Sequence, residues 1–171
     1  DLLNLARLAA VQLDRTAHAT LISSNQWNSP KYREVVAPFR AMLASTVGLR
    51  FIYTVRGDGN TVLFGVDAAE PLDLDHDGRI DQAMLGEVYD DAPPAIRVAL
   101  RTGQPQVASE PYTDKWGSFM GGFVPLPKRE GGVECVVAVE VDAAVYRGRL
   151  ALMDRAVATG LAVALLASIG M

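Results

Sequence analysis

The chain has 171 residues, of which 50% are hydrophobic and 21% are charged, and its formal net charge is −4. This length suits one domain and is sufficient to bury a core without metal or disulfide cross-links. The mildly acidic balance argues against a nucleic-acid partner, which would favour a basic surface. The single cysteine, Cys135, can supply neither an internal disulfide nor a cysteine-based zinc site.

Residues 1–48 are predicted to form an N-terminal helical segment. From Asp1 to about Ser24 the apolar residues recur at helical spacing, which predicts one long amphipathic helix. A shorter helix is expected to begin at Ser29-Pro30, because serine is a good N-cap and proline suits the first helical position. Pro38 lies inside this second helix and is expected to kink it.

Residues 49–142 are predicted to form the core of the domain, around an antiparallel sheet of about five strands. A hairpin with its turn at 57–60 comes first, and a short helix is expected from Pro94 to Arg101, closed by Gly103. The predicted strands cover residues 49–56, 61–66, 106–108, 119–126 and 133–141. The last strand is apolar on both faces and is therefore expected at the centre of the sheet. Helices before and after such a sheet predict an α+β fold.

Residues 143–171 are predicted to form an exit helix that runs into a membrane span. The stretch from Ala156 to Met171 carries no charge. A complete span needs about 20 apolar residues, so the run is either the start of a span or a helix that packs against another surface. The first residue is Asp1 and not methionine, and we expect the chain to be a domain from a longer protein.

An acidic stretch resembles the start of a calcium-binding loop. Carboxylates alternate along it, a glycine stands at the sixth position, and hard Ca²⁺ prefers six to eight oxygen ligands. The predicted ligands are Asp73, Asp75, Asp77, the carbonyl oxygen of Arg79, and Asp81. Met84 occupies the twelfth position, where a glutamate would be expected. The alternative is a solvated loop whose aspartates and glycine form turns.

A second cluster, Glu110–Ser118, places two aromatic residues, two acids and a lysine on one loop before a strand. Tryptophan and tyrosine offer faces for stacking an organic ligand, and the charged groups can orient it. The predicted ligand-binding residues are Tyr53, Tyr112, Asp114, Lys115 and Trp116. The alternative is that the aromatic residues close the end of the core while Asp114 and Lys115 are solvated.

Candidate catalytic groups are weak, so an enzyme is disfavoured. His18 and His76 lie near no nucleophile signature. Asp14 and His18 are four residues apart on the predicted helix, a spacing that more often reflects packing than metal binding. Cys135 lies in an apolar strand, where a thiol is usually inert.

Several stretches together resemble one known family. They are Leu5–Ala10 with Asp14 and His18, Ser29–Tyr32, Phe51–Val55, Gly86–Asp90, Glu110–Gly117 and Val137–Asp142. In this order they resemble an extracytoplasmic PAS-like (Cache) sensor domain of a bacterial membrane-bound signalling receptor.

This resemblance implies a domain anchored to the inner membrane, exposed in the periplasm or outside the cell, and dimeric along the N-terminal helix. A small ligand would bind on one face of the sheet and shift the exit helix, which would signal to an intracellular kinase or cyclase domain. The paired aromatic, arginine and aspartate pattern of amino-acid-binding members is missing, so the ligand stays open. The alternatives are a calcium-stabilised adhesion or interaction module on a membrane stalk, and a hydrolase with an unrecognised site.

Overall fold

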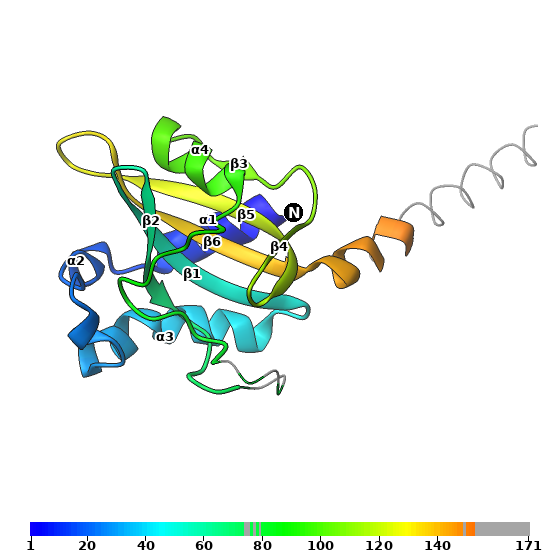
Figure 1. Cartoon of the computed structure of the whole chain (residues 1–171), viewed down its shortest axis with the longest axis horizontal. Coiled ribbons are helices and arrows are strands. Elements are labelled where there is room, and N and C mark those ends of the chain that lie inside the picture. The colour runs from blue at the N-terminus through cyan, green and yellow to red at the C-terminus, as the bar shows by residue number, and fades with distance from the viewer. Residues whose placement is uncertain (74–75, 77, 79, 149, 153–171) are drawn as a thin grey trace, which may run out of the picture.

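An antiparallel sheet forms the centre of the structure, a computed structural model that describes residues 1–73, 76, 78, 80–148 and 150–152 (Figure 1). The helices are α1 (Leu2–Gln12), α2 (Arg15–Ala19), the 3-10 turn η1 (Ser24–Gln26), α3 (Pro30–Ser45) and α4 (Pro94–Thr102). The strands are β1 (Leu49–Asp58), β2 (Thr61–Asp67), β3 (Gln106–Val107), β4 (Tyr112–Asp114), β5 (Gly117–Pro127) and β6 (Val133–Asp142).

The strand order is β2-β1-β6-β5-β3, and the short strand β4 pairs with the beginning of β5, on the same edge as β3. The strand pairs are all antiparallel. Strand β6 lies between β1 and β5, which confirms the prediction that the most apolar strand is central. The predicted α+β fold, with helices before and after an antiparallel sheet, is confirmed. Strand β4 was not predicted, because it is only three residues long.

The predicted single helix over residues 1–24 is wrong. Helix α1 ends at Gln12, and Leu13 has an extended backbone with φ −72° and ψ 119°. Asp14 then caps α2, because its Oδ1 accepts a hydrogen bond from the Ala17 N–H at 2.9 Å. An aspartate that caps a new helix competes with continuation of the previous one. The predicted start of α3 is confirmed, since the Ser29 hydroxyl accepts from the Tyr32 N–H at 3.1 Å.

Both faces of the sheet are covered. Helices α1, α2 and α3 pack on the face that carries Ile52, Val137 and Val139. Helix α4 and the long loop between β2 and α4 cover the opposite face, which carries Phe51, Tyr53 and Val55. Successive side chains of a strand point to opposite faces, so β1 and β6 serve two cores at once. This accounts for the apolar character of both faces of β6.

A helix leads away from the sheet directly after β6 (Figure 1, orange). We call it the exit helix; its described residues are 143–148 and 150–152. Asp142 caps it, since its Oδ1 accepts from the N–H groups of Ala144 at 2.7 Å and Val145 at 3.2 Å. Within the described residues, no helix has the length and apolar character needed to cross a membrane. The predicted start of a span at 156–171 lies outside those residues.

Candidate functional site

A small cavity lies on the sheet face opposite α1, α2 and α3. Aromatic rings and carboxyl groups form its wall: Phe51, Tyr53, Phe64, Asp67, Asp81, Tyr89, Asp114, Trp116 and Glu140. We call it the acidic cavity. Its volume is about 10 Å³, close to the space that one water-sized sphere needs. As it stands in the structure, the cavity can therefore hold a single small polar group.

Glu140 is the carboxylate that the central strand of the sheet contributes to the cavity. It projects from β6, and the residue is 1% exposed. The hydroxyls of Tyr53 and Tyr112 both donate to the same oxygen, Oε1. Burial raises the pKa of Glu140 to about 8, and the hydrogen bonds from the two tyrosines act in the opposite direction.

Asp114 forms a second carboxylate centre, at the end of β4. The Tyr89 hydroxyl donates to its Oδ2 at 2.6 Å, and the Trp116 backbone N–H donates to its Oδ1 at 2.9 Å. Burial raises the pKa of Asp114, and these hydrogen bonds oppose the shift. Asp114 thereby joins the long loop, through Tyr89, to the turn that carries Trp116.

Asp67, at the end of β2, holds the two ends of the loop that closes the cavity. Its Oδ1 accepts from the Ala69 N–H at 2.9 Å and its Oδ2 accepts from the Ala83 N–H at 2.7 Å. Its own backbone N–H donates to the hydroxyl of Tyr32, from α3, at 2.8 Å. Burial raises the pKa of the Asp67 carboxyl to about 7, against the two backbone hydrogen bonds.

Aromatic rings form the rest of the wall. Phe64 and Tyr89 are stacked with ring centroids 4.5 Å apart, and Trp116 meets Phe64 edge-on at 5.4 Å. The Trp116 indole N–H donates to the carbonyl oxygen of Ile80 at 3.2 Å. This bond connects the wall to the loop that carries the predicted calcium ligands.

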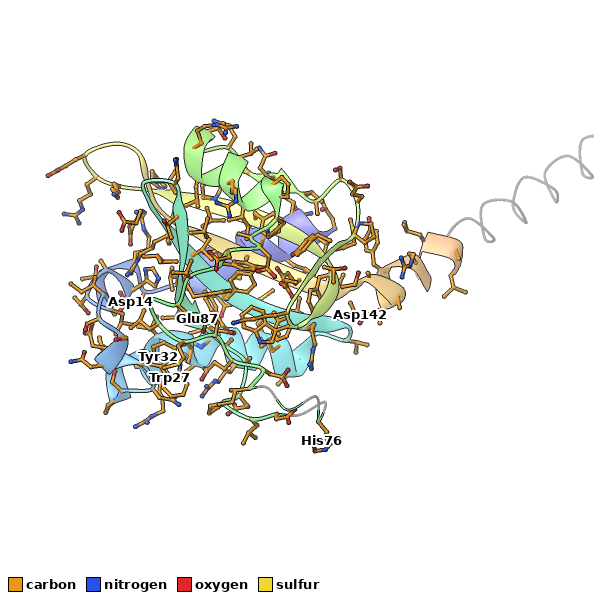
Figure 2. All side chains as sticks on the ribbon, viewed as in Figure 1. Asp14, Trp27, Tyr32, His76, Glu87 and Asp142 are labelled. Carbon is orange, nitrogen blue, oxygen red and sulfur yellow. The ribbon has the colours of Figure 1, made fainter. Side chains whose placement is uncertain are left out.

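Trp116 separates the acidic cavity from a larger hollow on the surface, which we call the outer groove. The groove has a volume of about 400 Å³ and is lined by Trp27, Ile80, Gln82, Met84, Glu87, Lys115 and Trp116. Lys115 forms an ion pair with Glu87, and its Nζ lies 4.2 Å from the centroid of the Trp116 ring. Figure 2 shows Trp27 near the start of α3 and Glu87 on the long loop.

The structure brings the five predicted ligand-binding residues into one region. Tyr53, Asp114 and Trp116 line the acidic cavity, Tyr112 donates to Glu140, and Lys115 lies on the outer groove.

Sequence reasoning missed Glu140, Tyr89, Asp67, Phe51 and Phe64. Glu140 carried a usable signal, because it is a charged residue inside a strand that is otherwise apolar on both faces. No local pattern marks Asp67 or Tyr89, which come to the cavity through the long loop.

The predicted calcium ligands are only partly within the described residues. Asp75, Asp77 and Arg79 lie outside them. Asp73 Oδ2 accepts from the Gly78 N–H at 3.0 Å, while Asp81 is 4% exposed, lines the acidic cavity and pairs with Arg50 at 3.2 Å. His76 lies at the outer tip of this loop (Figure 2). Calcium binding at residues 73–81 stays a prediction.

If the loop binds calcium, adding the ion should raise the melting midpoint of the chain and EDTA should reverse the rise. At about 100 times the dissociation constant the stabilisation is about 2.7 kcal/mol. Differential scanning calorimetry measures it, with Mg²⁺ as the matched ion. Identical midpoints in calcium and in EDTA would rule out the site.

A second cluster of possible metal ligands lies on the other face of the sheet. Atoms of His18, Glu134 and Cys135 lie within 4.8 Å of one another. Arg56 places a guanidinium nitrogen 3.1 Å from His18 Nδ1, and Arg15 pairs with Glu134 at 2.9 Å. Burial and the Arg56 charge lower the pKa of His18 to about 4. Two guanidinium groups thus already supply positive charge there, and we assign no metal to this cluster.

No family model and no curated protein matches the chain. Among solved structures, it is similar to a putative GAF sensor protein from Burkholderia vietnamiensis, with 20% identity, coverage of 81% of this chain and 76% of that chain, and a TM-score of 0.42. It is similar to the extracellular domain of the putative histidine kinase mmHK1S-Z2, with 15% identity, coverage of 82% and 57%, and a TM-score of 0.43. A third is the reduced form of fRMsr of Staphylococcus aureus, with 12% identity, coverage of 78% of each chain, and a TM-score of 0.39.

All three TM-scores are below 0.5, and all three identities are 20% or lower. These likenesses are therefore partial, and they assign neither a family, nor a role, nor a ligand to this chain.

Proposed function

We propose that this chain is the extracytoplasmic sensory domain of a membrane-bound signalling receptor. It binds a small ligand in the acidic cavity and transmits the binding event through the exit helix. The observation that carries the proposal is the position of Glu140. This buried carboxylate faces the cavity from the strand that continues directly into the exit helix.

The route from cavity to helix is short. Glu140 and Asp142 are two residues apart on β6, and Asp142 caps the exit helix through Ala144 and Val145. A ligand that moves the Glu140 carboxylate also biases the backbone that positions this cap. Figure 2 places Asp142 where the strand passes into the helix. The arrangements of this backbone with and without ligand are the two-state element that a sensor needs.

The start of α1 and the exit helix lie side by side, as suits a domain held between two membrane helices. Leu2 and Leu5 of α1 line one groove together with Val145, Tyr146 and Leu150 of the exit helix. The anchoring membrane and the periplasmic or extracellular location are part of this proposal.

A homodimer along α1 also belongs to the proposal. Leu8 and Val11 of this helix are 58% and 86% exposed and are three residues apart, so they share one outer face. Apolar side chains on an exposed helix face favour contact with a second copy. We assign no catalytic role to the chain, and the output domain is proposed to be a separate part of the receptor.

A thermal-shift screen of small metabolites tests the proposal. Neutral, anionic, zwitterionic and cationic compounds are added one at a time to the purified chain. At least one is expected to raise the melting midpoint, and Trp116→Ala and Asp114→Ala should each abolish that rise. Arg101→Ala, an exposed change in α4, is the matched control and should preserve it. Compounds that still raise the melting midpoint of both cavity variants would place ligand binding elsewhere and contradict the proposal.

A further inference from the structure

The carboxyl groups of the acidic cavity are not balanced by positive charge on its wall. Four carboxyl groups line the cavity, and its lining contains no lysine, arginine or histidine. Arg50 pairs with Asp81, while Asp67 and Asp114 accept hydrogen bonds on both of their oxygens. Those three groups are therefore satisfied by the protein itself.

Glu140 is different, because one of its oxygens has no partner. Both tyrosine hydroxyls donate to Oε1, and within the described part of the chain Oε2 has no hydrogen bond. The residue is 1% exposed and lines the cavity. Oε2 is not one of the side-chain atoms that are both fully buried and without a partner, so it touches open space beside the cavity wall and can accept a hydrogen bond from a bound group.

The aromatic wall favours a particular kind of donor. The rings of Tyr53, Phe64, Tyr89 and Trp116 surround the space beside Glu140. Ring faces attract cations, and the attraction strengthens where water is excluded. A metal ion fits less well, because Ca²⁺ requires six to eight oxygens and the cavity leaves few that are not already engaged.

The size of the two hollows determines the shape of the ligand. The acidic cavity has about 10 Å³, enough for a group the size of one water molecule. The outer groove of about 400 Å³ begins on the other side of Trp116, with Trp27, Ile80 and Met84 in its lining. A compact polar head in the cavity and an apolar body in the groove would fill both.

From these observations we infer that the ligand is a primary amine, with its ammonium group on Glu140 Oε2 and its apolar body in the outer groove. This inference rests on the proposed function and names its ligand class. Trp116 and the Lys115–Glu87 ion pair lie between the two hollows and must move for the amine to enter. Because Lys115 is already paired with Glu87, the groove offers no ready partner for a ligand carboxylate.

Titration calorimetry with a matched set of probes tests the inference. The probes are propylammonium and 2-phenylethylammonium, the neutral 2-phenylethanol, the anion 3-phenylpropionate, and the amino acid phenylalanine. The two ammonium ions are expected to bind, with 2-phenylethylammonium tighter. Glu140→Gln should weaken its binding at least tenfold, while Glu110→Gln, an exposed change near β4, should leave it unchanged.

The pH provides a second readout if Glu140→Gln affects folding. An ammonium ion must displace the proton that the buried Glu140 carboxyl retains, so affinity for 2-phenylethylammonium should rise between about pH 6.5 and about pH 8.5. Asp114→Asn serves as a second cavity variant and should also weaken binding.

Tighter binding of 2-phenylethanol, 3-phenylpropionate or phenylalanine than of the amine would overturn the inference. So would failure of both ammonium ions to bind, or binding that Glu140→Gln does not weaken. If another class of compound binds in a manner that depends on Trp116 and Asp114, the ammonium inference falls and the proposed sensory function stands. If no compound of any class does so, both fall.

Discussion

Replacing Asp67 with alanine is expected to lower the free energy of unfolding by about 3 kcal/mol. The carboxylate is 3% exposed and accepts from the N–H groups of Ala69 and Ala83. Removing it leaves two buried N–H donors without partners, and each such donor costs about 1–3 kcal/mol. The variant no longer pays the free-energy cost of burying this carboxylate, and this offsets part of the loss.

The same substitution should also open the acidic cavity. Ala69 and Ala83 lie near the two ends of the loop that carries the Ile80 carbonyl, to which the Trp116 indole donates. Urea denaturation measures the stability change, and tryptophan fluorescence in a Trp27→Phe background reports the exposure of Trp116. Asp58→Ala, which removes an exposed aspartate at the tip of the hairpin, is the control and should shift stability by less than about 0.5 kcal/mol. Equal stability losses in the two variants would contradict the role of Asp67.

Raising the pH from about 6.5 to about 8.5 is expected to lower the melting midpoint of the unliganded chain by about 5 °C. Burial raises the pKa of Glu140 from 4.5 to about 8 and that of Asp67 from 3.8 to about 7. Between the unfolded-state pKa and the folded-state pKa of each group, the folded state holds more protons than the unfolded state. The stabilisation is therefore complete at low pH and is lost as the pH rises through the folded-state values.

The groups that face Glu140 act in both directions. The charges of Asp114 and Asp67 add to the effect of burial and oppose its ionisation, whereas the hydrogen bonds from Tyr53 and Tyr112 lower its pKa and offset part of the shift. His18 has the opposite effect on the pH dependence of stability, because burial lowers its pKa from 6.5 to about 4. That effect is confined to pH values below about 6.5. The chosen range avoids that contribution.

Thermal melts of the wild type and of Glu140→Gln at both pH values separate the contributions. The glutamine cannot ionise, so the variant should keep only the smaller dependence due to Asp67. Glu110→Gln should behave like the wild type, because its side chain is exposed. A midpoint that is constant or rises over this range would contradict the buried, proton-holding state of Glu140.

Local sequence rules predicted the order of the main elements well because short-range chemistry decides them. The Ser29-Pro30 start of α3, the hairpin of β1 and β2, and the Gly103 end of α4 all follow from residues within a few positions. The break at Leu13 was missed because helical periodicity outweighed the one signal against it, the capping tendency of Asp14.

The candidate site was predicted only in part because its residues come from distant strands and a loop. Tyr53 and Tyr112 meet only at Glu140, and Tyr89 reaches Asp114 across a gap of 25 residues. Periodicity places such residues on a face of the sheet but cannot show which of them converge. The charge at position 140 in an apolar strand was the strongest indication in the sequence.

The central claim is that binding at Glu140 is transmitted to the exit helix, and amide hydrogen exchange tests it most directly. Exchange is measured with and without saturating 2-phenylethylammonium, or the compound whose binding depends on Trp116 and Asp114. We predict slower exchange at residues 112–117, a change in exchange at residues 142–148, and no change at the 57–61 turn. Slower exchange at 112–117 with unaltered exchange at 142–148 would show that the cavity binds a ligand without signalling through the exit helix, and would contradict the account.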